Sequence, residues 1–183
     1  MSATLPNGSR DVAATSVTAL QTRYAAVRAR SLALIEGLSA EDACAQSMAD
    51  TSPAKWHLAH VTWFFETFIL ERFEAPFVPH HPAYRTLFNS YYNGIGAQFA
   101  RPDRGLLTRP ALAEIIAYRA AVDARMLTLI AQEFVAVHDL VELGLHHEQQ
   151  HQELLLMDVK HLLSRNPLQP AYRDEAFVPL HTP

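Results

Sequence analysis

The stretch LGLHHEQQHQELLL, residues 143–156, carries the strongest fold signal in the chain. Its leucines recur at helical spacing, which predicts a helix with one buried face. Between those leucines lie three histidines, two glutamates and three glutamines, side chains that bind metals or handle protons. The stretch therefore predicts a buried helix that carries chemistry, and the rest of the chain decides which chemistry.

Size and composition exclude several classes of protein. The chain has 183 residues, 49% of them hydrophobic, which suits one well-packed domain rather than two. Its net charge of −4 offers no basic surface for a nucleic-acid backbone. No apolar run approaches the roughly 18 residues of a membrane span. Cys44 is the only cysteine, so no internal disulfide is expected. We expect a soluble cytoplasmic protein without nucleic-acid or membrane partners.

Four segments have helical periodicity and cap signals, and no run of residues predicts a strand. The approximate ranges of the predicted helices are 16–37, 53–72, 108–132 and 139–164. Ser52 is the expected N-cap of the second helix, with Pro53 in its first turn. The fold class is therefore all-α.

A long connection separates the second predicted helix from the third. Residues 73–108 are rich in proline and contain the turn signal Asn93-Gly94. Such a long connection is uncommon in a compact domain and is more often functional than idle. Four helices with one long crossover loop predict a four-helix bundle, and bundle cores often hold metal sites. We expect a flexible N-terminus over 1–14, one domain over 15–166 and an extended tail over 167–183.

The histidines of the last helix predict one side of a metal site. His147 and His151 are four residues apart, so their imidazoles lie about 40° apart around the helix and face one point. Gln150 lies about 60° to one side of His147. One helix does not easily supply a third ligand, but WHLAH on the second helix offers His57 and His60. We prefer His60, because aromatic residues one turn away on either side would form an apolar wall. Those residues are Trp56, Trp63 and Phe64.

Three imidazoles would leave coordination positions open for water, substrate or dioxygen, as in catalytic rather than structural sites. Imidazole binds Fe, Zn, Ni and Cu, so the ligand types do not fix the metal. The alternative without a metal is that these histidines are hydrogen-bonded beside a core. Glu148 and Glu153 point away from the histidine face and are expected to bond to solvent or to neighbouring helices.

The segment from His147 to His151 also matches H-E-x-x-H, the zinc metalloprotease helix in which the glutamate is a general base. The pattern is short enough to recur by chance. No third ligand follows at metzincin spacing, and no strands are predicted to hold a peptide substrate. The protease interpretation is therefore disfavoured.

Three separated segments resemble one family of non-haem iron enzymes. They are SPAKWHLAHVTWFFETF, LFNSYYNGIGAQFARPDRGLLTRP and LGLHHEQQHQELLLMDVKH. In this order they resemble the DinB-like N-terminal domain of the ergothioneine-biosynthesis sulfoxide synthases, over residues 17–172. The resemblance implies a DinB-like four-helix bundle in which His60, His147 and His151 hold Fe(II), with Zn or Ni as alternatives.

The resemblance also implies substrates and their contacts. Gln150 would contact hercynine, the trimethylated histidine substrate, and Arg101 and Arg104 would bind carboxylates of the thiol, which is cysteine or γ-glutamylcysteine. A guanidinium fork suits a carboxylate. The spacing of the two arginines alone favours solvated loop charges. The implied reaction is Fe(II)- and O2-dependent C–S bond formation between hercynine and the thiol, with oxidation of the sulfur.

Family members carry a second domain that completes the active site and supplies a catalytic tyrosine. The present sequence has no room for that domain, so we assign no catalytic residue and expect an excised or truncated, incomplete oxidoreductase site.

Two other functions remain open. One is a free-standing DinB-like metal-dependent thiol transferase. The other is a metal-binding interaction domain, in which the 73–108 crossover docks a missing or separate second domain. The aromatic residues available for docking are Phe88, Tyr91, Tyr92 and Phe99.

Overall fold

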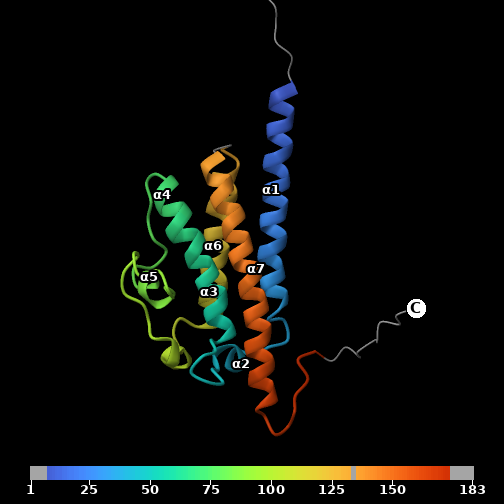
Figure 1. Cartoon of the computed structure of the whole chain (residues 1–183), viewed down its shortest axis with the longest axis vertical. Helices are drawn as coiled ribbons and strands as arrows, with labels where there is room; N and C mark the ends of the chain where they lie inside the picture. Colours follow the sequence, from blue (N-terminus) through green and yellow to red (C-terminus); the bar gives the residue numbers. More distant parts are fainter. Residues whose placement is uncertain (1–7, 133–134, 174–183) are drawn as a thin grey trace, which may run out of the picture.

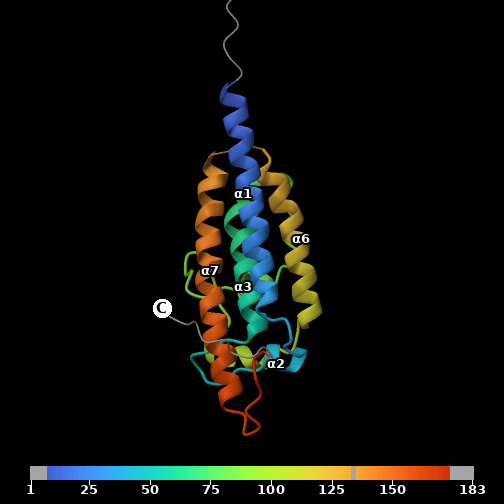
Figure 2. The same ribbon diagram turned by 90° about the vertical axis from the view of Figure 1, so that its right-hand side faces the viewer.

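Four long helices lie side by side along the length of the molecule (Figures 1 and 2). The computed structural model describes residues 8–132 and 135–173. Its long helices are α1 (Gly8–Ala33), α3 (Ala54–Phe65), α6 (Leu112–Ile130) and α7 (Val135–Ser164). Within the described residues there is no strand, so the all-α prediction is confirmed. None of the described helices is long and apolar enough to cross a membrane.

The helix α3 packs between α6 and α7, and α1 lies across the core from it (Figure 2). All of its residues from Ala54 to Phe65 are buried. A helix that is apolar on every side is stable only inside a core, which explains this position. Its few polar side chains must therefore find partners within the protein. They include both histidines of WHLAH, and this is how the fold brings histidines into the interior.

The second predicted helix is continuous but irregular. After α3 it widens into the π-helical turn η1 (Glu66–Leu70) and ends in α4 (Glu71–Phe73). The predicted N-cap was wrong by one residue, because Pro53 occupies that position without a side-chain cap. The Ser52 hydroxyl instead accepts from Nη1 of Arg104 at 2.8 Å. The backbone N–H of Ser52 donates to Oδ2 of Asp158 at 2.8 Å. These partners bind Ser52 to the long connection and to α7.

Other helix bounds differ from the predicted ones by several residues. The first helix begins at Gly8, inside the segment predicted as a flexible N-terminus, and residues 1–7 lie outside the described residues. The third begins at Leu112, where the N–H of Ala111 donates to the Glu114 carboxylate at 2.7 Å. The last begins at Val135 rather than 139. Of the predicted tail, residues 174–183 are likewise not described.

A short helix, α2 (Ala40–Cys44), was not predicted. Its N-terminus has a capping box, in which the Ser39 hydroxyl accepts from the N–H of Asp42 at 3.1 Å. The Asp42 carboxylate accepts from the N–H of Ser39 at 3.0 Å. The serine and aspartate were visible in the sequence, but five residues are too few to show a periodic apolar face.

The connection between α4 and α6 runs along the outer side of α3 (Figure 1). It contains α5 (Tyr84–Leu87) and the 3-10 helix η2 (Arg101–Leu106). Gln46 attaches η2 to the segment before α3, since its Nε2 donates to the Arg101 carbonyl at 2.9 Å. Its Oε1 accepts from the N–H of Gly105 at 2.6 Å. The long connection is therefore held in place by specific bonds.

Phe88 is only 2% exposed and contacts Tyr84 and Tyr118, so its predicted availability for docking was wrong. Phe88 therefore belongs to the core, where its ring packs against the rings of Tyr84 and Tyr118. Tyr91 is exposed, whereas Tyr92 and Phe99 are partly buried.

Candidate metal centre

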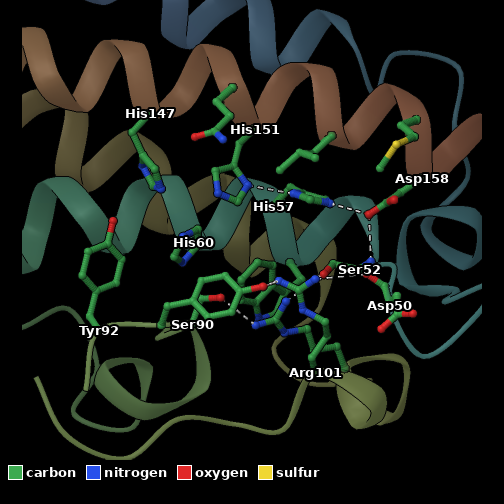
Figure 3. Close-up of a pocket in the computed structure, with 16 residues that line it drawn as sticks. Asp50, Ser52, His57, His60, Ser90, Tyr92, Arg101, His147, His151 and Asp158 are labelled. Atoms are coloured by element: carbon green, nitrogen blue, oxygen red, sulfur yellow. Dashed lines mark hydrogen bonds and ion pairs between the residues drawn. The ribbon is translucent and has the colours of Figure 1, made fainter.

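Three histidines from two helices converge at one point of the interior (Figure 3). His60 comes from α3, and His147 and His151 come from successive turns of α7. One ring nitrogen from each lies within 4.8 Å of the nitrogens of the other two. This is the trio that the sequence predicted, and its donor atoms are close enough to share one metal ion.

The His60 ring is fixed on both faces and at one edge. It stacks on Trp56 at 4.7 Å and on Trp63 at 5.5 Å between ring centroids, which is the predicted aromatic wall. Its Nδ1 lies 2.6 Å from the carbonyl oxygen of Phe88. Because a carbonyl only accepts, Nδ1 carries the hydrogen and Nε2 keeps a free lone pair. The long connection thus supplies the group that orients this imidazole.

His151 is oriented by a relay of polar groups. Its Nδ1 lies 2.9 Å from Nδ1 of His57, and Nε2 of His57 lies 2.9 Å from Oδ2 of Asp158. The sequence placed either His57 or His60 at the bundle axis, but both are buried there. They differ in their partners, because His60 faces both His147 and His151, whereas His57 lies between His151 and Asp158.

The imidazoles are held in their neutral form. Burial lowers the pKa of His147 to about 4. Burial, reinforced by the neighbouring His147, also lowers the pKa of His60, and burial together with His60 lowers that of His151. Burial likewise lowers the pKa of His57 despite its bond to Asp158. A metal binds the neutral imidazole, so the site needs no deprotonation at neutral pH.

A cavity of about 520 Å³ opens onto the three histidines. Arg101 and Arg104 line it, as does the exposed Gln150 at its rim. The fold therefore gathers every residue that was predicted to contact a substrate around one space. Tyr92 and Asp158 also line the cavity and were not predicted to do so.

The two arginines of the cavity differ. Arg104 is 2% exposed, so the interpretation as a solvated loop charge was wrong for this residue. Its guanidinium lies 3.4 Å from the centre of the Trp56 ring, and its Nη2 donates to Ser90 at 3.2 Å. Burial and the neighbouring Arg101 lower its pKa to about 10, which leaves it charged at neutral pH. Arg101 is partly exposed and bonds to the Tyr91 hydroxyl.

Comparison with known families gives one match. A model of the DinB superfamily matches residues 23–155, which is most of the chain. The chain belongs to the DinB superfamily. No curated protein matches it. The match covers the three histidines, Gln150 and both arginines of the cavity, whereas Asp158 lies just beyond its end.

The donor set of the DinB domain fits a transition metal. Nδ1 of His147 is buried, and no group among the described residues bonds to it. A buried polar atom without a partner is unfavourable unless something from outside the chain satisfies it. Three neutral imidazoles suit zinc, iron, nickel or copper. The superfamily is metal-binding, and these three histidines are placed to hold one metal ion.

The DinB site includes residues that sequence reasoning missed. Asp158 lies seven residues after His151, about 20° away around the helix, so its place on the histidine face was readable from α7. Ser52 and Ser90 had no such signal, because they approach Arg104 from two different loops.

Proposed function

We propose that this chain is the metal-binding domain of an ergothioneine-type sulfoxide synthase, with Fe(II) held by His60, His147 and His151. The convergence of three neutral imidazoles at the floor of a cavity that two arginines line is the observation that carries the proposal. The four long helices then form the DinB-type bundle, and the connection from 74 to 111 is its crossover.

Bound Fe(II) would supply open positions at which a substrate and dioxygen meet. The residues of the chain bind and orient the organic substrates. Gln150 lies beside His151 at the rim, where its amide can bond to the hercynine imidazole. Arg104 is already fixed by Ser52, Ser90 and Trp56, so binding a carboxylate there costs little further side-chain ordering.

Arg101 has a different place in the proposal. It lies at the exposed side of the cavity and holds Tyr91, so the second carboxylate of the thiol would bind nearer the solvent. Both cysteine and γ-glutamylcysteine carry a carboxylate that satisfies Arg104. Only the longer thiol carries a second carboxylate for Arg101 in the same molecule.

Metal content is the first test. The protein is purified without a chelator or a histidine tag and analysed for metals beside His60→Ala and His146→Ala. His146 is the matched control, because it is adjacent to His147 but exposed and outside the trio. We expect nearly one metal ion per chain in the parent and in His146→Ala and a large loss in His60→Ala. Equal metal content in all three proteins contradicts the site.

Activity is the second test. The Fe(II)-loaded protein is incubated with hercynine and each thiol in air, and the sulfoxide product is measured by mass spectrometry. A product that requires both oxygen and Fe(II) supports the proposal. Turnover of a thiol with an electrophilic acceptor in the absence of oxygen would instead favour the thiol transferase function.

A further inference from the structure

The His57 side chain forms the middle of a hydrogen-bonded relay to which the proposed function assigns no role. It is 4% exposed and lies between α3 and α7. One ring nitrogen contacts a proposed metal ligand, and the other contacts a carboxylate, as Figure 3 shows. Both nitrogens of a buried imidazole are thus used within the protein.

The relay has a defined direction. Oδ2 of Asp158 accepts from the N–H of Ser52 at 2.8 Å and lies 2.9 Å from Nε2 of His57. Because a carboxylate accepts, Nε2 of His57 carries a hydrogen. A neutral His57 then has a lone pair at Nδ1, so the hydrogen in the 2.9 Å contact with His151 belongs to Nδ1 of His151.

The relay therefore decides whether Nε2 of His151 carries a hydrogen or a lone pair. With its hydrogen at Nδ1, a neutral His151 has its lone pair at Nε2, as His60 does through its bond to Phe88. A hydrogen on Nε2 would block that atom as a metal donor. Because Nδ1 of His151 is already bonded to His57, Nε2 is the ring nitrogen left for a metal, and a lone pair there requires the hydrogen to lie on Nδ1.

We propose that His57 is a positioning residue that, held by Asp158, fixes the tautomer of His151 so that its Nε2 is the metal donor. This inference rests on the proposed metal site and extends it to a residue that does not touch the metal. Partners of this kind typically change metal affinity about 10–100-fold when they are removed.

The test compares two replacements of His57. His57→Phe keeps an aromatic ring but removes the acceptor, whereas His57→Asn keeps an acceptor oxygen near the position of Nδ1. Ring tautomers are read from long-range 1H–15N NMR spectra of the metal-free proteins at one pH. Affinity is measured with Co(II) in competition with a chromophoric chelator. His161→Ala on α7 is the control, since His161 bonds to Ser47 away from the trio.

We expect the Nδ1–H tautomer of His151 in the parent, in His57→Asn and in the control. In His57→Phe we expect the Nε2–H tautomer to appear and Co(II) affinity to fall about 10–100-fold. Asp158→Ala removes the carboxylate at the other end of the relay and should also produce the Nε2–H form of His151. This variant tests the inference if His57→Phe does not fold.

An unchanged tautomer and unchanged affinity in His57→Phe would overturn the inference while leaving the metal site in place. Equal losses in the Phe and Asn variants would also overturn it, because the acceptor would then be irrelevant. Failure of the proposed site looks different, since the parent would then bind Co(II) no better than His60→Ala.

Discussion

On one side of α7, Glu148 has both carboxylate oxygens bonded, whereas on the adjacent side His147 leaves Nδ1 buried without a partner. The Glu148 carboxylate accepts from Arg28 of α1 at 2.8 Å and from Arg119 of α6 at 2.6 Å. It also accepts from the Ser31 hydroxyl at 2.5 Å. The two residues are neighbours in the sequence, but a helix turns them about 100° apart.

The difference separates a structural cluster from a chemical one. Burial alone raises the pKa of Glu148, but the two arginines outweigh burial and lower it to about 2. The fully bonded carboxylate of Glu148 thus joins three helices, α1, α6 and α7. The histidine cluster instead keeps its imidazoles neutral beside a cavity, and Nδ1 of His147 has no partner there among the described residues.

The largest expected effect comes from removing the Glu148 carboxylate, both oxygens of which are bonded. Glu148→Ala leaves the buried Arg119 without a carboxylate partner and Arg28 with Asp123 alone, and we expect a loss of about 3–5 kcal/mol in the free energy of unfolding. Urea denaturation of the metal-free protein measures it. The control is Glu153→Ala, an exposed glutamate on the same helix, which should stay within about 0.5 kcal/mol of the parent. Similar values for both variants would show that the buried cluster contributes little.

The next largest effect is expected when a metal ion binds at the histidine cluster. A metal that binds only the folded state stabilises it by about 2.7 kcal/mol at a free concentration 100 times Kd. We expect this gain in thermal or urea unfolding of the parent and its absence in His151→Ala. If His151→Ala gains as much as the parent, the metal binds elsewhere.

A third prediction concerns the distance between α3 and α7. A Cβ at Gly144 would lie 2.5 Å from Cε1 of Phe65, a fully buried ring. Overpacking of this kind costs about 1–3 kcal/mol, offset by up to about 1 kcal/mol of helix propensity. Gly144→Ala should also weaken metal binding, because His60 and His147 lie on the two helices that it pushes apart. Gly94→Ala meets no atom within 4 Å and serves as the control.

The neutral imidazoles make the stability of the metal-free protein depend on pH. The folded-state pKa of His147 is about 4, whereas the ordinary value is 6.5. Above pH 6.5 neither state binds the proton, so the group has no effect. As the pH falls from 6.5 toward 4, the unfolded chain takes up the proton first, and stability falls. Urea unfolding of parent and His147→Gln at pH 7.5 and 5 should show a smaller loss in the variant; equal losses would exclude His147 as the cause.

The smallest effect on stability is expected at the cavity rim. Arg101→Gln should change the free energy of unfolding by less than about 0.5 kcal/mol, because the side chain is partly exposed. Metal content should not change. If the proposed thiol binds there, the variant raises KM for γ-glutamylcysteine more than for cysteine. An equal change for both thiols would remove Arg101 from the distinction between them.

Much of this arrangement was predictable from local pattern. Periodic apolar residues predicted the four long helices, although their observed ends differ from the predicted ones by up to eight residues. The four-residue interval placed His147 and His151 together, and the aromatic neighbours favoured His60. The short helix α2 was missed because five residues show no periodic apolar face. The N-cap at Pro53 was missed because Ser52 bonds Arg104 and Asp158, which only the tertiary structure brings near it.

The sequence by itself determined which side chains share a face of one helix, because a helix fixes about 100° between successive residues. That rule places His147, His151 and Asp158 in one row and turns Glu148 away from it. Only the tertiary structure decided which groups of other helices each row contacts, since the rotation and spacing of separate helices depend on how their side chains pack. The carboxylate of Glu148 thus found Arg28 and Arg119, and His57 found both Asp158 and His151.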